Sequence, residues 1–200
     1  MSTIIHNNFE MTELERQQSA LSTITNMLIS RKWIDNNNKT LLNITDITST
    51  ISINCLNNKV AIKFYNSKLN TLKNDREIDT LFSSYPAHHY ILIVNEIATK
   101  AEKQIMDSQN IEVFRIMEVI KDISKHHLVP KHILLSKDEA NTVMSEYKLD
   151  KKDMGRIYID DPMARYFYAQ KDDIIQIIRE NINSGYSTYY RLVVLGSIYN

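Results

Sequence analysis

The sequence has few of the residues that interrupt regular structure, since its 200 residues include only three glycines and three prolines. The glycines stand at positions 155, 185 and 196, and the prolines at 86, 130 and 162. This scarcity excludes long low-complexity linkers. It also excludes a glycine-rich loop of the kind that holds a nucleotide phosphate.

Cysteine and long apolar runs are scarce as well. Cys55 is the single cysteine, so neither an intrachain disulfide nor a thiolate zinc cluster can form, and we expect a reducing compartment. The longest apolar runs are far shorter than the ~20 residues that span a bilayer. The first ten residues lack the basic and apolar regions of a secretory signal. We therefore expect an intracellular protein without a membrane partner.

Charge of either sign is not in excess, because 24 Lys and Arg residues balance 24 Asp and Glu residues. A neutral chain is not expected to hold nucleic acid by its overall field. The hydrophobic content of 43% is ordinary for a globular protein. At 23.4 kDa the chain has the size of one large domain or two small ones, and it can bury a real core.

The first 124 residues alternate between helix and strand signals. Residues 1–11 read as a frayed polar start, and residues 36–55 give no firm signal. Thr12 and Glu15 have capping-box spacing. The elements expected here are a helix over 13–30 with Leu14, Leu21, Ile24 and Leu28 on its apolar face, a half-buried strand over 59–65, connecting chain over 66–74, a helix over 75–81, a central strand over 90–94, and a helix over 100–108 that Thr99 and Glu102 would cap. The pattern over 111–123 fits either a helix or a strand.

The last third has its own set of elements, so we place a domain boundary near residues 124–128. Ser136 and Glu139 form another capping box, and Asp161 precedes Pro162 as an N-cap precedes a first-turn proline. The expected elements are helices over 137–148 and 162–168 and a hairpin of strands 174–179 and 189–195 with its turn at 183–185.

No motif for catalysis or metal binding stands out. His126, His127 and His132 crowd together, but their spacing is not that of zinc ligands, and they are interpreted as structural or interface residues. Cys55 has no neighbouring base in the sequence, and no nucleophile elbow is present. We therefore expect no catalytic residue, no cofactor and no metal. A nuclease-like metal enzyme and a free-standing adaptor remain alternative hypotheses.

Tyrosine is concentrated in the last third of the chain, which is typical of protein interfaces. Stacking on single-stranded nucleic acid is the rival interpretation, but it needs an excess of basic residues. Residues 126–200 hold ten basic and ten acidic side chains, which favours the protein interface. The residues alone thus indicate a two-part α/β protein that acts as an interaction module.

A series of motifs in the last third resembles one family. His126-His-Leu-Val-Pro-Lys-His132 is similar to an H-x-L-V-P-x-H signature, and further motifs follow in register. They are Ile133–Glu139, Tyr147-Lys-Leu149, Arg156-Ile157, Asp161-Pro-Met-Ala-Arg-Tyr166, Ile174–Arg179, Ser184-Gly185 and Tyr190-Arg191. The family is the fifth subunit shared by the eukaryotic nuclear RNA polymerases I, II and III, whose C-terminal domain has a counterpart among the small subunits of archaeal RNA polymerase.

The resemblance implies an α/β (α+β) protein of two domains. Residues 1–124 would be a jaw domain with a mixed sheet and flanking helices, in which 111–123 is mostly strand. Residues 125–200 would be a small assembly domain of helices and a β-hairpin that docks on the largest polymerase subunit. The chain would be a non-catalytic polymerase subunit, with other polymerase subunits and downstream duplex DNA as further partners. It would act in the nucleus or, if it comes from a large DNA virus, in the virion and the cytoplasmic replication site.

The resemblance also assigns residues to an interface with other subunits. They are His126, Leu128, Val129, Pro130, His132, Asp161, Pro162, Arg165, Tyr166, Arg179, Tyr190 and Arg191. Arg179 and Arg191 could instead pair with local carboxylates across the hairpin. Thr99 and Lys100 would lie near downstream DNA.

The chain departs from the family pattern at three places. Gly155 replaces a usual proline, and a usual proline of the jaw is replaced near Thr99. Tyr168-Ala-Gln-Lys-Asp172 stands where Gly-Leu-Lys-Arg-Gly is usual, so both glycines and the arginine are gone. We expect this loop to be the part that behaves most differently from the family.

Overall fold

The computed structural model describes residues 11–35, 50–55, 59–72, 75–106, 108, 110–181 and 185–196. Nearly all of the expected polar start over 1–11 and most of the expected turn over 183–185 lie outside these residues. The chain divides into two compact units, residues 1–121 and 122–200, called here the N-terminal and C-terminal units. Both combine helices with a four-stranded sheet, so the α+β class is confirmed. Within the described chain, no helix has the length and apolar character needed to cross a membrane.

The N-terminal unit is built on a mostly parallel sheet with the strand order β1-β2-β3-β4. β1 runs antiparallel to β2, whereas β2, β3 and β4 are parallel. The strands are β1 (Ile51–Asn54), β2 (Lys59–Leu69), β3 (His89–Ile97) and β4 (Ile111–Arg115). The helices are α2 (Glu13–Ser30), α3 (Arg76–Ser84), α4 (Thr99–Met106) and α5 (Ile116–Val119).

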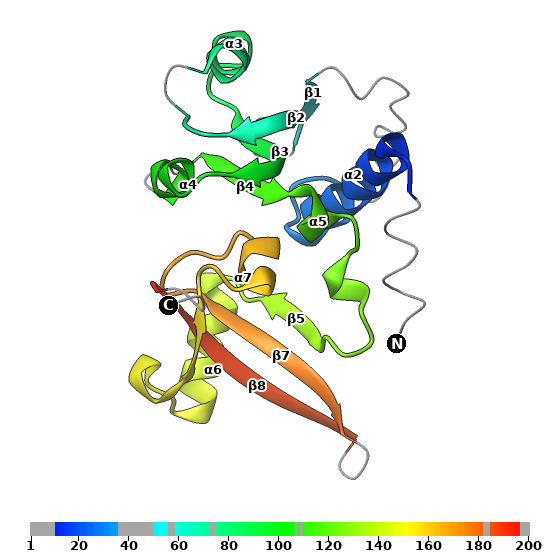
Figure 1. Cartoon of the computed structure of the whole chain (residues 1–200). Helices are drawn as coiled ribbons and strands as arrows, with labels where there is room; N and C mark the ends of the chain where they lie inside the picture. The colour runs from blue at the N-terminus through cyan, green and yellow to red at the C-terminus, as the bar shows by residue number, and fades with distance from the viewer. Residues whose placement is uncertain are drawn as a thin grey trace. The chain divides into compact units, whose positions relative to one another are not determined.

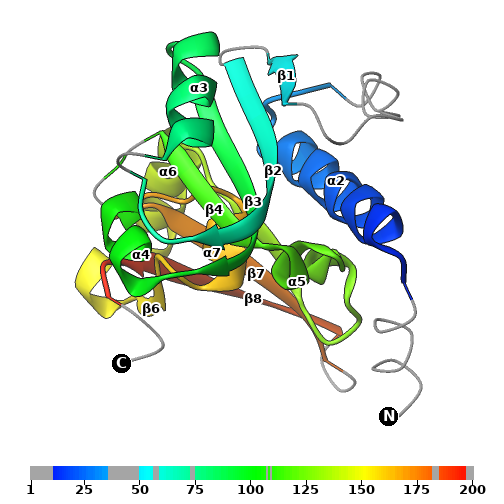
Figure 2. The ribbon, with the colours of Figure 1, turned by 45° about the horizontal axis from the view of Figure 1, so that its top comes forward.

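Helices cover both faces of this sheet. α3 and α4 lie on one face and α2 lies on the other (Figures 1 and 2). Ala61, Tyr65 and Leu92 from the strands pack with Ile78 of α3 and Ala101 of α4. Because both faces are covered, the expectation of a half-buried strand at 59–65 is wrong: Val60 and Ile62 are buried on one side of β2, and Ala61 and Tyr65 on the other. It also continues to Leu69, with an irregularity in register after Tyr65, so residues 66–69 are strand rather than connecting chain.

The local signals in this unit were mostly informative. The Thr12–Glu15 capping box is present and α2 spans Glu13–Ser30, as predicted, but Leu14 on its expected apolar face is 51% exposed. β3 is a central strand, as predicted, and Asp75 caps α3.

Two predictions near the end of the unit need correction. Thr99 is not the cap of α4, because the amide of Glu102 donates to the carbonyl of Ala98 and Thr99 is already helical. The ambiguous segment 111–123 is strand only as far as Arg115 and then turns into α5.

The C-terminal unit contains a second sheet with the order β5-β7-β8-β6. Its strands are β5 (Lys131–Leu134), β6 (Gly155–Tyr158), β7 (Ile174–Asn181) and β8 (Gly185–Val194). The predicted hairpin is confirmed as the antiparallel pair β7–β8. β5 and β6 were not predicted, because four residues are too few to show a clear alternation.

Two helices cover opposite faces of this sheet. α6 (Lys137–Tyr147) packs through Ala140 on Ile174 and Leu192. α7 (Pro162–Tyr166) packs through Ala164 on Ile175 and Val193. The hairpin therefore carries a separate hydrophobic core on each face, since neighbouring residues of a strand point to opposite sides. Both predicted caps are present, at Ser136 for α6 and at Asp161 for α7.

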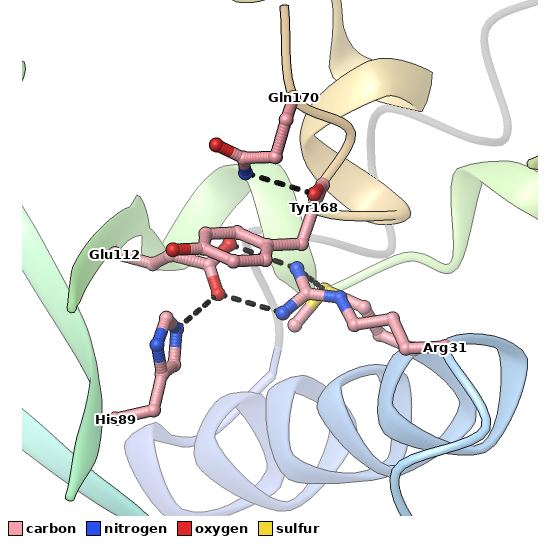
Figure 3. Close-up of polar contacts among 6 residues, drawn as sticks. Arg31, His89, Glu112, Tyr168 and Gln170 are labelled. Carbon is pink, nitrogen blue, oxygen red and sulfur yellow. Dashed lines mark hydrogen bonds and ion pairs between the residues drawn. The ribbon is translucent and has the colours of Figure 1, made fainter. Parts of the chain in front are cut away.

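A buried charged cluster joins α2 to the sheet of the N-terminal unit (Figure 3). Arg31, just after α2, makes two hydrogen bonds of 2.6 and 2.8 Å to the carboxylate of Glu112 in β4. His89 of β3 contacts the same carboxylate through Nε2 at 2.7 Å. The Arg31 side chain is 1% exposed and that of Glu112 is 10% exposed. Trp33 encloses the cluster, with its ring 5.1 Å from the Arg31 guanidinium and 5.0 Å from the His89 ring.

The charges in this cluster decide the ionisation of Glu112. Burial alone would raise the pKa of the Glu112 carboxyl. The positive charge of Arg31 and the hydrogen bonds from His89 and Arg31 outweigh burial and lower that pKa to about 2. Glu112 is therefore ionised in the folded protein, and its charge is matched by the buried guanidinium.

We predict that Glu112→Gln lowers the free energy of unfolding by about 3–5 kcal/mol, because the Arg31 charge would remain buried without its counter-charge. Chemical denaturation of the purified chain measures this loss. Glu96→Gln is the matched control: Glu96 also pairs with a neighbouring strand, at 3.3 Å from Lys68, but both side chains are more than half exposed. The control should lose less than about 1 kcal/mol. Equal losses in the two variants would contradict the structural role of the buried pair.

The same carboxyl predicts a pH dependence of stability. Its pKa of about 2 in the folded chain lies below the ordinary value of 4.5, so its stabilisation is complete above pH 4.5 and is lost as the pH falls towards 2. The full contribution is of the order of 3 kcal/mol, the free-energy equivalent of that pKa difference. Denaturation of the wild type and Glu112→Gln at pH 7 and pH 3 should therefore show a smaller difference between them at pH 3. A difference that does not change with pH would contradict the ionised state.

Candidate subunit interface

The His126–His132 segment is a turn followed by an edge strand. Residues 123–125 form a short 3-10 helix, and the amide of Val129 then donates to the carbonyl of His126 at 2.8 Å. The amide of Leu128 donates to Nδ1 of His126, and the Leu128 side chain is 74% exposed. After Pro130 the chain becomes extended as β5. The turn thus holds a large apolar side chain in solvent, as an interface requires.

His132 is the residue of this motif whose ionisation is affected by other predicted interface residues. Its Nδ1 lies 2.7 Å from the carbonyl of Pro130, which can only accept, so Nδ1 carries a hydrogen. Partial burial lowers the pKa of His132, and the charges of Arg179 and Arg191 act in the same direction, whereas Asp161 opposes them. Asp161, Arg179 and Arg191 are therefore within electrostatic range of the His132 ring.

The hairpin presents two arginines and a tyrosine on the same face as His132. His132 lies opposite Ile177, Ile177 lies opposite Tyr189, and Arg179 and Arg191 are each two residues further along their strands. Cζ of Arg179 lies 5.4 Å from the centre of the Tyr189 ring, and Nη1 of Arg191 donates to the carbonyl of Arg156 at 3.2 Å. We call this surface, made of His132, Arg179, Tyr189 and Arg191, the arginine face.

Tyr190 is directed away from the arginine face. As the neighbour of Arg191 in β8 it points to the opposite side, where it packs beside the core under α6. Its ring centre lies 5.9 Å from that of Tyr147, and partial burial raises the pKa of its phenol. The Tyr-Arg pair of the sequence motif is therefore divided between the two faces of the sheet.

Most residues of the α7 motif make contacts within the C-terminal unit. Oδ1 of Asp161 accepts the amide of Met163 at 2.8 Å, and Pro162 occupies the first helical turn. Tyr166 is 4% exposed and its hydroxyl lies 3.3 Å from Oγ of Ser124, while Arg165 is half-buried. Tyr166 is thus a packing residue of the fold, not an exposed contact.

Tyr189, on the arginine face, was not among the predicted interface residues, although its alternation with Arg191 and Ser187 in a strand was a usable signal.

The loop after α7 contains two residues with left-handed backbone conformation. Tyr168 has φ 55° and Asp172 has φ 71°. They occupy the two positions where the family resemblance places glycine, the residue that adopts such angles without a steric penalty. Backbone hydrogen bonds fix the loop, including Asp172 to Val193 at 3.0 Å, and the side chain of Gln170 donates to the carbonyl of Tyr168 (Figure 3). The chain thus adopts left-handed angles at these two positions without glycine.

The remaining candidates lie elsewhere. Thr99 and Lys100 are exposed in the first turn of α4, in the N-terminal unit. His126 and His127 stack with ring centres 4.6 Å apart, but no group of three metal-binding side chains occurs in the described parts of the chain. Burial raises the pKa of the Cys55 thiol to about 11, so it is not ionised at neutral pH and is a poor nucleophile.

Comparison with known proteins finds one family. The model of the RNA polymerase Rpb5 C-terminal domain matches residues 121–193. DNA-directed RNA polymerase subunit 5 of Acanthamoeba polyphaga mimivirus is 29% identical over 185 residues, which cover 87% of this chain and 90% of the relative. Subunit Rpo5 of the archaeon Thermofilum pendens is 45% identical over 75 residues, which cover 38% of this chain and 94% of the relative. A subunit of RNA polymerases I, II and III of Dictyostelium discoideum is 34% identical over 114 residues, which cover 54% of this chain and 58% of the relative.

We predict that Asp172→Gly raises the free energy of unfolding by about 0.5–1 kcal/mol, because glycine relieves the left-handed strain at an exposed position and keeps the bond to Val193. Thermal and chemical denaturation measure the change. Lys171→Gly is the control one residue earlier, where φ is not positive, and it should lower stability by a similar amount. Stabilisation by both substitutions would contradict the explanation from backbone conformation.

Proposed function

The chain belongs to the RNA polymerase subunit 5 family, and from this premise we propose that it is a non-catalytic subunit of a multisubunit DNA-directed RNA polymerase whose C-terminal unit joins it to the largest subunit. The domain division is part of the proposal: residues 1–124 as jaw domain and residues 125–200 as assembly domain. Nucleotide transfer is assigned to other subunits of the enzyme.

The observation that carries this proposal is the archaeal relative. The 75 aligned residues make up 94% of that protein, and this length is close to that of residues 121–193, which the C-terminal domain model matches. That protein is named as an RNA polymerase subunit. The relative is named as a polymerase subunit although it is this short, which supports a role of the C-terminal unit in joining this chain to the enzyme.

The N-terminal unit is proposed to lie at the lower jaw near downstream DNA. Thr99 and Lys100 are its candidate residues, both exposed at the start of α4. The chain has no excess of positive charge, so its own field would not hold DNA. We propose that the larger subunits supply the positive channel and that this unit contributes shape beside it.

The first test is purification of the full-length chain, tagged and expressed in its own cellular context, followed by mass spectrometry. We expect the two largest polymerase subunits at near-equal amounts with the tagged chain. Recovery of the chain without a large polymerase subunit would overturn the proposal. Measurement of the native mass of the complex separates a stoichiometric subunit from a free-standing adaptor.

Truncation locates the joining module. We expect that deleting residues 126–200 abolishes recovery of the largest subunit, because it removes most of the residues that the C-terminal domain model matches. Deleting residues 1–120 should preserve recovery, since this leaves the matched residues 121–193 intact. The ratio of the largest subunit to the tagged chain measures both variants. The opposite pattern would assign the joining role to the N-terminal unit.

A further inference from the structure

The arginine face carries positive charge that no carboxylate among the described residues pairs with. Residues 126–200 have equal numbers of basic and acidic side chains. Even so, neither Arg179 nor Arg191 has a carboxylate oxygen within 4.0 Å among the residues that the structure describes. Asp161 acts on the neighbouring His132, but its carboxylate already accepts the amide of Met163. The local cross-strand pairing considered from the sequence is therefore not what these arginines do.

Both arginines are held in place on this face. Arg179 lies over the Tyr189 ring, and Arg191 is bound by the carbonyl of Arg156. Holding a long side chain reduces the entropy that it loses when a partner binds. A guanidinium has five N–H donors, so the single hydrogen bond of Arg191 leaves most of its donors available. The arrangement is suited to receiving acceptor groups from outside.

The surroundings of the two arginines favour a protein partner over nucleic acid. Tyr189 is 49% exposed between them, and tyrosine and arginine together are typical of protein interfaces. A site on duplex DNA commonly makes about 6–10 phosphate contacts, which two arginines do not provide. Carboxylates bind guanidinium groups with matching two-pronged geometry.

We propose that the arginine face receives an acidic segment of the largest polymerase subunit, with one carboxylate on Arg179 and another on Arg191. This inference rests on the proposed function and adds the chemistry of the partner. Arg179 lies opposite Ser187, and Arg191 lies opposite Ile175, four positions from Arg179 in β7. That separation is about 13 Å along the strand, so two carboxylates four residues apart in an extended partner segment would fit.

Charge reversal on the two faces of the same sheet tests the proposal. The variants are Arg179→Glu, Arg191→Glu and the two combined, in the full-length tagged chain. The control is Lys131→Glu, because Lys131 is exposed, lies beside His132 and points to the opposite face. Each single reversal should lower recovery of the largest subunit by about tenfold, and the control should stay within about twofold. Thermal unfolding of each variant shows whether it is folded, and Arg179→Gln, at an exposed position, gives a second variant without charge reversal.

A photo-crosslinking amino acid identifies what lies on each face. At position 187 it would sit on the arginine face opposite Arg179, and at position 188 it would sit on the other face. We expect the adduct from position 187 to map to a segment of the largest subunit with at least two Asp or Glu residues, and the position 188 adduct not to map there.

The outcomes separate the two proposals. If the wild-type chain recovers no polymerase, the proposed function is wrong and this inference falls with it. If the wild type recovers polymerase but the folded arginine variants recover it equally, or the adduct maps to a segment without carboxylates, only the acidic partner is wrong. Loss of recovery after nuclease treatment, together with crosslinks to nucleic acid from position 187, would mean that the arginines bind phosphate and would overturn the acidic partner as well.

Discussion

The N-terminal unit depends on the buried pair of Arg31 and Glu112, because a charge removed from water has to be neutralised where it lies. Arg31 is at the end of α2 and Glu112 is in β4, so the pair fixes the helix against the sheet at one point. His89 of β3 contacts the same carboxylate, and the Trp33 ring packs against the His89 ring. The two-pronged hydrogen bond fixes the end of α2 against β4, while the packing of Leu21, Ile24 and Leu28 holds the rest of the helix.

In the C-terminal unit the corresponding constraint is the alternation of side chains along a strand. One hairpin supplies a core under α6, a core under α7 and, beyond α7, the arginine face. Tyr190 and Arg191 are neighbours in sequence but serve opposite faces, one in packing and the other in recognition. Residues of one sequence motif thus have different roles, and Tyr166 and Asp161 stabilise the fold that displays the others.

The loop after α7 holds two non-glycine residues in left-handed backbone conformation. Backbone hydrogen bonds hold the loop, and Tyr168 and Asp172 take the left-handed conformation at the positions where the family resemblance places glycine. The expectation that this loop behaves differently from the family stays a prediction, and its left-handed angles are ones that glycine adopts without a steric penalty.

The sequence by itself determined the features that are local. Thr12, Ser136 and Asp161 cap their helices through bonds spanning two or three residues, and the hairpin follows from two nearby β-branched runs. The family motifs also lie in the linear order of the chain, so the resemblance could be read from them. The tertiary structure decided what depends on distant contacts: the Arg31–Glu112 pair joins residues 81 positions apart, and the burial of β2 on both faces requires helices from elsewhere in the chain. It also decided which interface candidates are available, since Arg179 is exposed near the end of β7 whereas Tyr166 is buried in α7.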